Sequence, residues 1–172
     1  MHKTEFGAVR LQLDDEAALR TAYRHLTTRL GPRMAAGLVQ CMAAPGVEMF
    51  IGGLQDPAFS PVVFCGSGGV LVELFGDAVC WLCPLTDGDA QEMIDQVRGV
   101  ARLRGHRGAE RADESALREA LIRTSALLDA APEISEMDIN PLTVLSQGAS
   151  ALDVRIRVSA AVPSRPTRHV RY

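Results

Sequence analysis

Short apolar runs bounded by glycine, proline or polar residues predict most of the strands in this chain. Such runs occupy residues 6–13, 37–42, 46–52, 62–65 and 78–82. The runs at 46–52 and 62–65 are separated by Asp56-Pro57 and Ser60-Pro61, which are typical of turns. These two runs therefore predict a hairpin with a loop of several residues.

Three other stretches carry apolar residues at the spacing of a helix face. They predict helices from about residue 15 to 30, from 86 to 98 and from 113 to 130. Each begins at a side chain that can cap a helix N-terminus, namely Asp14 or Asp15, Thr86, and Asp113. The basic stretch before the last helix, residues 99–111, is predicted to be a loop whose arginines face either water or a phosphate.

The stretch from Glu136 to Leu142 carries the most informative pattern of the chain. Successive side chains of a strand point to opposite faces. Glu136, Asp138 and Asn140 therefore share one face, while Met137 and Ile139 share the other. This strand is expected to cover a core with one face and to present oxygen-bearing side chains on the other.

The same strand is predicted to continue into a second hairpin. Its turn lies at residues 146–149, and the chain returns along 150–158. If the turn pivots at its middle, Asn140 lies directly across from Asp153, with Cβ atoms roughly 5 Å apart. An amide oxygen and a carboxylate at that separation suit one Mg²⁺ ion, which prefers oxygen ligands and keeps several waters. A slip of one residue would place the two on opposite faces, and a solvated polar strand face is the alternative interpretation.

A glycine cluster, Gly66-Ser67-Gly68-Gly69, directly follows the predicted strand at 62–65. Glycines let backbone amides approach an anion closely. The cluster matches neither the Walker pattern nor a full dinucleotide fingerprint. A phosphate-facing loop and a glycine-rich bend are both compatible with it.

Composition and charge exclude several classes of protein. A net charge of −3 over 172 residues argues against a general binder of nucleic acid or anionic membranes. The 47% hydrophobic and 23% charged content is typical of one globular domain or two small lobes. No apolar run reaches transmembrane length and the start has no signal-peptide core, so a cytoplasmic location is expected. Cys80 and Cys83 would point to opposite faces of a strand, so we expect no zinc or redox site there.

Several motifs, taken in order along the chain, resemble one known family. They are Gly46-Val-Glu-Met-Phe-Ile-Gly52, Asp56-Pro57, Pro61-Val-Val-Phe-Cys-Gly-Ser-Gly-Gly-Val-Leu-Val-Glu73, Pro84-Leu-Thr86, Arg107-Gly108 and Glu136-Met-Asp-Ile-Asn-Pro-Leu142. From about residue 2 to 158 the chain resembles the C-terminal ATP-grasp region of ADP-forming (NDP-forming) acyl-CoA synthetases. More distantly, it is similar to the nucleotide-binding subunit of succinyl-CoA synthetase. The resemblance implies an α/β (α+β) fold of ATP-grasp-like mixed sheets with flanking helices.

The resemblance also implies roles for particular residues in binding Mg²⁺ and ATP or ADP. Asn140 and Asp153 would hold Mg²⁺ against the nucleotide phosphates, in agreement with the hairpin argument. Gly66, Gly68 and Gly69 would lie at the phosphate-facing loop.

Further roles follow from the same resemblance. Gln40 lies where the family's hinge strand meets the adenine, and Glu48 would line the nucleotide pocket. His2, followed by Lys3 and Thr4, matches a motif whose histidine is implicated in relaying phosphate.

The chain also departs from the family pattern, because the family's first lobe begins well upstream of the His-Lys motif. We therefore expect residues 1–36 to be a remnant of the first ATP-grasp lobe, built from a strand and a helix. Residues 37–160 would form the second lobe, and residues 161–172 a mobile basic tail. The CoA-binding and acyl-ligase domains would be partner domains or subunits of the same enzyme.

Two functions from different classes follow from this sequence. The first is the ATP/ADP- and Mg²⁺-binding part of an acid–thiol ligase, which interconverts acyl-CoA, ADP and phosphate with acid, CoA and ATP through a phosphohistidine. On this hypothesis the chain is incomplete alone. The alternative is a non-catalytic module for subunit contact or nucleotide sensing. The strand predicted at residues 6–13 would expose an unpaired edge, so self-association or a homodimer is also predicted.

Overall fold

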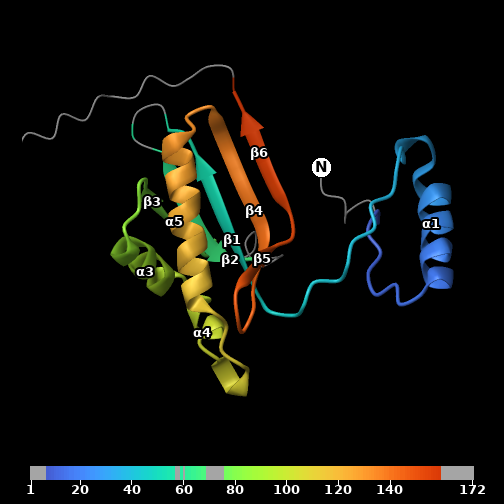
Figure 1. Ribbon diagram of the computed structural model, residues 1–172, viewed down its shortest axis with the longest axis horizontal. Helices are drawn as coiled ribbons and strands as arrows, with labels where there is room; N and C mark the ends of the chain where they lie inside the picture. The colour runs from blue at the N-terminus through green and yellow to red at the C-terminus, as the bar shows by residue number, and fades with distance from the viewer. Residues whose placement is uncertain (1–6, 57–58, 60, 69–75, 160–172) are drawn as a thin grey trace, which may run out of the picture. The chain divides into compact units, whose positions relative to one another are not determined.

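The structure is a computed structural model that describes residues 7–56, 59, 61–68 and 76–159. Its chain divides into two compact units, Met1–Ala43 and Ala44–Tyr172. His2, Gly69 and the predicted tail at 161–172 lie outside the described residues. Figure 1 shows the elements of each unit.

The first unit is organised around one helix, α1 (Glu16–Leu30), followed by the 3₁₀ turn η1 (Gly31–Arg33). The carboxylate of Asp15 accepts a hydrogen bond of 2.7 Å from the backbone N–H of Ala18, which satisfies one free donor of the first turn. Gly31 ends the helix at a positive φ of 52°. The prediction of this helix and its ends is confirmed.

The strands predicted at 6–13 and 37–42 are wrong for the residues that the structure describes. Residues 8–13 and 37–42 have no regular secondary structure. A strand is held by hydrogen bonds to a neighbouring strand, and none of the sheet pairings involves these residues. These residues are apolar, but no described strand forms backbone hydrogen bonds with them in the sheet.

The second unit is built on an antiparallel sheet with the strand order β3-β2-β1-β4-β5, in which β6 also pairs with β4. Its strands are β1 (Val47–Leu54), β2 (Val62–Ser67), β3 (Ala78–Leu82), β4 (Ile134–Val144), β5 (Ala149–Ala151) and β6 (Val154–Val158). The described strands pair only in the antiparallel sense. The predicted hairpin of β1 and β2 is confirmed, with Ile51 opposite Cys65.

Helices α3 (Asp87–Gln96) and α5 (Glu114–Ala130) lie over one face of this sheet (Figure 1). Both begin at the predicted caps, since Thr86 and Asp89 form a complete capping box and Asp113 caps α5. The core lies between these helices and the sheet. Its fully buried large side chains include Met49, Ile51, Val63, Met93, Ile94, Leu117, Leu121, Leu128 and Val144.

The basic stretch at 99–111 is not the plain loop that the sequence predicted. It contains α4 (Val100–Leu103) and the 3₁₀ turn η2 (His106–Gly108), because Leu103 is drawn into the core. Its Arg104 forms ion pairs with Asp95 of α3 and Glu114 of α5. These pairs raise the pKa of Arg104. They connect α3 with α5, so the guanidinium of Arg104 faces two carboxylates instead of the phosphate that the sequence left open.

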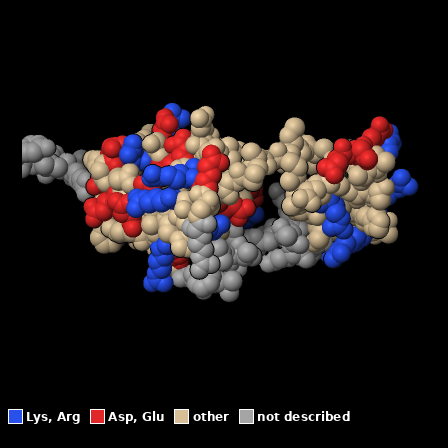
Figure 2. Space-filling model, turned by 90° about the horizontal axis from the view of Figure 1, so that it is seen from below, with Lys and Arg blue, Asp and Glu red and all other residues tan. Residues whose placement is uncertain are grey.

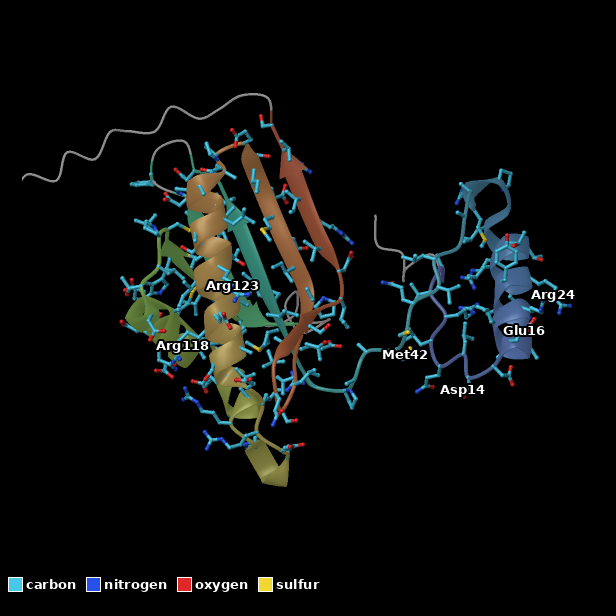
Figure 3. All side chains as sticks on the ribbon, in the orientation of Figure 1. Asp14, Glu16, Arg24, Met42, Arg118 and Arg123 are labelled. Atoms are coloured by element: carbon cyan, nitrogen blue, oxygen red, sulfur yellow. The ribbon has the colours of Figure 1, made fainter. Side chains whose placement is uncertain are left out.

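The outer surface of the helical layer is polar. Arg123 pairs with Glu119 one turn earlier on α5, and Arg118 lies 3.1 Å from Asp87 at the start of α3 (Figure 3). Basic and acidic side chains alternate over the side of the second unit seen in Figure 2. Among the described residues, no helix is long and apolar enough to cross a membrane.

Candidate functional site

The sheet face that points away from α5, here called the open face, carries the polar side chains that the sequence analysis singled out. The alternation along β4 leaves Met137 and Ile139 buried toward the helices, while Glu136 is exposed on the other side. Asp138 and Asn140 share the face of Glu136 and are half-buried. The predicted division of β4 into an apolar and a polar face is confirmed.

Asn140 lies opposite Asp153, as the hairpin argument predicted. The backbone N–H of Asn140 donates to the carbonyl oxygen of Asp153 at 3.1 Å, and that of Leu152 donates to Pro141 at 3.0 Å. The same register holds on both sides of this pair, with Leu142 opposite Ala151 and Ile139 opposite Val154. The turn therefore pivots between Ser146 and Gln147.

The tip of this hairpin is tied to the start of α5. Gly148 adopts a positive φ of 79°, and its carbonyl accepts a hydrogen bond of 2.9 Å from the backbone N–H of Leu145. The N–H of Gly148 donates to the carboxylate of Asp113 at 2.8 Å, while Asp113 donates its own N–H to the carbonyl of Leu145 at 2.7 Å. The bond from Gly148, supported by that from Ala116, lowers the pKa of Asp113. This carboxylate holds the hairpin in register from outside the sheet.

The donor set at Asn140 and Asp153 fits a small divalent cation. It consists of an amide oxygen and a carboxylate, which are hard ligands of the kind that Mg²⁺ binds in proteins. Both residues are half-buried, so they retain access to water. The described residues contain no cluster of three or more His, Cys, Asp or Glu side chains able to hold a metal. An ion at this pair would therefore complete its coordination with water or with oxygens of a ligand.

Two glycines at the end of β2, Gly66 within the strand and Gly68 just after it, are required by backbone packing. A Cβ atom on Gly66 would lie 2.0 Å from the carbonyl oxygen of Asp77 and 2.5 Å from the ring of Phe50. A Cβ atom on Gly68 would lie 2.7 Å from the carbonyl oxygen of Met49. Such distances exclude any side chain, so β1, β2 and β3 can approach closely here only because these positions are glycine.

Sequence reasoning missed a buried polar contact at the same end of β2. The hydroxyl of Ser67 donates to the carboxylate of Asp77 at 2.7 Å. Asp77 also accepts from the backbone N–H groups of Arg98 at 2.8 Å and Gly99 at 3.0 Å. Burial raises the pKa of Asp77, but these hydrogen bonds outweigh it and leave the pKa below its usual value. A single acidic residue after a glycine cluster gives no sequence signal for this contact, because its partners are ten and more residues away.

The predicted site residues that the structure describes belong to both units. Glu48 is exposed on β1, and its carbonyl accepts a hydrogen bond of 2.8 Å from the N–H of Gly68. Glu48, Gly66 and Asn140 thus belong to one sheet, while Gly68 directly follows β2 and Asp153 lies between β5 and β6. Gln40 lies in the first unit, where it is exposed.

Comparison with known proteins assigns the chain to a group of enzymes. The ATP-grasp domain family matches residues 1–158. Acetate–CoA ligase [ADP-forming] I of Archaeoglobus fulgidus is 35% identical over 161 residues, which are 91% of this chain and 23% of that protein. The beta subunit of acetate–CoA ligase [ADP-forming] I of Pyrococcus furiosus is 30% identical, and the match spans 91% of this chain and 69% of the subunit. The chain therefore spans about a quarter of the first relative and about two thirds of the second.

A solved structure agrees with these matches. It is the dinucleotide-forming acetyl-coenzyme A synthetase 1 of Korarchaeum cryptofilum, in complex with coenzyme A and Mg-AMPPCP. It superposes with a TM-score of 0.82 at 40% identity, covering 92% of this chain and 71% of that one. The expected fold class is confirmed by this likeness.

Proposed function

The chain belongs to the ATP-grasp family, in the branch of the ADP-forming acyl-CoA synthetases, and on this premise we propose that it binds ATP or ADP with Mg²⁺ on its open face. It would be the nucleotide-binding part of an enzyme that interconverts acyl-CoA, ADP and phosphate with acid, CoA and ATP. Because it spans only part of its relatives, the full reaction would require CoA-binding and acyl-ligase domains or subunits.

The observation that carries this proposal is the pairing of Asn140 with Asp153 across the hairpin. Two oxygen ligands, one from β4 and one from the connection between β5 and β6, would hold a Mg²⁺ ion, while phosphate oxygens and water would complete its coordination. Bound Mg²⁺ would neutralise phosphate charge and hold the phosphates in line for transfer. The related structure from Korarchaeum cryptofilum was solved with Mg-AMPPCP, which agrees with this ligand class.

Other residues would orient the nucleotide around this pair. Glu48 on β1 would line the nucleotide pocket, and Gln40 would contact the adenine. Gly66, Gly68 and Gly69 would let the backbone approach the phosphates closely. His2 would relay the phosphoryl group to and from the partner domains.

We expect Asn140→Ala and Asp153→Ala each to weaken binding of Mg·ADP by roughly ten-fold, since each change removes one ligand oxygen. Because both residues would serve one ion, their effects should not add. The double variant should bind Mg·ADP with nearly the same affinity as the single variant that binds it less tightly. The affinity is measured by paramagnetic relaxation with Mn²⁺ in place of Mg²⁺, which detects complexes in the millimolar range.

Glu136→Ala is the matched control, because Glu136 lies on the same face of β4 but outside the pair. Its affinity for Mn·ADP should equal that of the parent chain. If Asp153→Ala melts at the same temperature as the parent chain and binds Mn·ADP with the same affinity, the metal assignment is overturned. Additive losses in the double variant would show instead that the two side chains contact separate parts of the nucleotide.

A further inference from the structure

Two arginines of β6 lie on the open face, which also carries the candidate metal pair. In the register of β4 and β6, Arg155 is opposite Asp138 and Arg157 is opposite Glu136. After Ile139, which lies opposite Val154, comes Asn140 opposite Asp153, the residue just before β6. The open face thus presents two acid–arginine pairs that lead directly to the metal pair.

The two arginines differ in the residue that they reach. The guanidinium of Arg157 lies 3.0 Å from the carboxylate of Glu136, its cross-strand neighbour. The guanidinium of Arg155 donates from Nη2 to Oδ2 of Asp153, two residues earlier in the chain, at 3.3 Å. In the chain without metal, a positive charge therefore already lies beside the carboxylate expected to bind Mg²⁺.

We propose that Arg155 serves the metal pair in two ways: it neutralises Asp153 while the site holds no metal, and it binds a nucleotide phosphate once the metal has entered. This inference rests on the proposed function, since it assumes that Asp153 is a ligand of the nucleotide-bound cation.

The first part follows from the charges at the pair. A divalent cation on Asp153 would lie within a few ångströms of the Arg155 guanidinium, and the two positive charges would repel each other. Free Mg²⁺ must therefore displace this guanidinium and binds more weakly than it would to an unpaired carboxylate. The site is in this way kept from binding the free cation strongly.

The second part follows from what a nucleotide would bring. Its phosphates carry negative charge and planar arrays of oxygens, which suit the fork of donors on a guanidinium. Arg155 can move to such a partner, because its side chain is 47% exposed and the 3.3 Å contact is long for a charged hydrogen bond. Metal and nucleotide would then bind cooperatively, because the phosphate draws Arg155 away from Asp153 and the metal binds the carboxylate that this frees.

The test compares Arg155→Met with Arg157→Met, a matched control on the same face of the same strand. Binding of Mn²⁺ to the full chain is measured by water proton relaxation, first alone and then with ADP. In Arg155→Met, affinity for free Mn²⁺ should rise on the order of ten-fold, whereas affinity for Mn·ADP should fall by about the same factor. Arg157→Met should leave both affinities within about two-fold of the parent, because its pair with Glu136 is solvent-exposed and remote from the metal pair.

Opposite shifts in one variant distinguish this role from a structural one, since damage to the hairpin would weaken both affinities. Arg155→Lys, which keeps the charge, should retain the low affinity for free Mn²⁺. Unchanged or reduced affinity for free Mn²⁺ in Arg155→Met would overturn the inference. If Asp153→Ala still abolishes Mn·ADP binding in that case, the proposed function stands without Arg155. If the parent chain binds no Mn·ADP at all, the proposed function fails and the inference fails with it.

Discussion

At the scale of single residues, Asp77 shows how a buried charge can be stabilising in this chain. The residue is 7% exposed, and its carboxylate accepts hydrogen bonds from one hydroxyl and two backbone amides. A buried carboxylate without such donors would be destabilising. Here the hydrogen bonds favour the charged form and join the end of β2 to the chain before α4.

The lowered pKa of Asp77 predicts a specific pH dependence of stability. Its stabilising contribution is complete above the unfolded-state pKa, about 3.9, and is lost as the pH falls through the lower folded-state value. We expect Asp77→Asn to reduce the free energy of unfolding by roughly 2–4 kcal/mol at neutral pH, and the difference from the parent should shrink below about pH 4. Urea unfolding at several pH values measures this difference.

Asp14→Asn is the control for that series, because Asp14 is an exposed carboxylate before α1. Asp14→Asn should leave the free energy of unfolding equal to that of the parent at every pH. A destabilisation by Asp77→Asn that stays constant down to strongly acidic pH would contradict the role given to the charged form of Asp77.

At the scale of elements, the junction of α5 with the β4–β5 hairpin connects the helical layer to the candidate site. Asp113 is both the N-cap of α5 and the acceptor for Gly148 at the hairpin tip. Because a slip of one residue would separate Asn140 from Asp153, whatever fixes the register of this hairpin also fixes the site.

We therefore predict that Asp113→Ala increases amide hydrogen exchange at Gly148 and Ala116 on the order of ten-fold, since both amides lose their acceptor. The affinity for Mn·ADP should fall with it. Protonation of Asp113 should have the same effect, so the protection of Gly148 in the parent, measured relative to intrinsic exchange at each pH, should decrease as the pH falls through the lowered pKa of this carboxyl.

The N-cap of α1 supplies the matched control for this change. Asp15→Ala removes the same kind of cap from a helix of the first unit, where Asp15 accepts from the N–H of Ala18. It should accelerate exchange at Ala18 while leaving Gly148 protected. Equal protection of Gly148 in Asp113→Ala and the parent would show that the turn holds its register without this carboxylate.

At the scale of the whole molecule, the two units differ in how much apolar surface they bury. In the described part of Met1–Ala43, Ala22 is the only buried hydrophobic residue. Large apolar side chains remain exposed there, namely Val9, Leu11, Leu13, Tyr23, Leu38, Val39 and Met42. The edge strand on which self-association was predicted is absent from residues 8–13. What remains is exposed apolar surface, which agrees with the proposal that this unit is part of a larger lobe.

This difference predicts that the second unit folds alone. A fragment of residues 44–159 should unfold cooperatively within a few degrees of the melting temperature of the full chain, because the large buried side chains lie within it. Circular dichroism of the two proteins on heating makes the comparison. A fragment that does not fold, or that melts far below the full chain, would show that residues 1–43 contribute to the core.

The sequence by itself determined the features that depend on local periodicity and local chemistry. Alternation along β4, together with a turn centred between Ser146 and Gln147, was sufficient to place Asn140 opposite Asp153. The helix caps at Thr86 and Asp113 were predicted for the same reason, since a cap involves only residues within one turn, while the first cap was narrowed to Asp14 or Asp15. The resemblance to the acyl-CoA synthetases likewise rested on motifs whose order is visible in the chain.

Only the tertiary structure decided which distant groups meet. It showed that Gly66 is required by the backbone of Asp77, that Asp77 binds Ser67, and that Arg155 rather than Arg157 reaches Asp153. It also showed that the apolar runs at 8–13 and 37–42 form no strand. The physical reason is the same in each case: a strand, a close backbone approach or an ion pair depends on a partner that the path of the folded chain supplies, and the periodicity of one segment does not specify that partner.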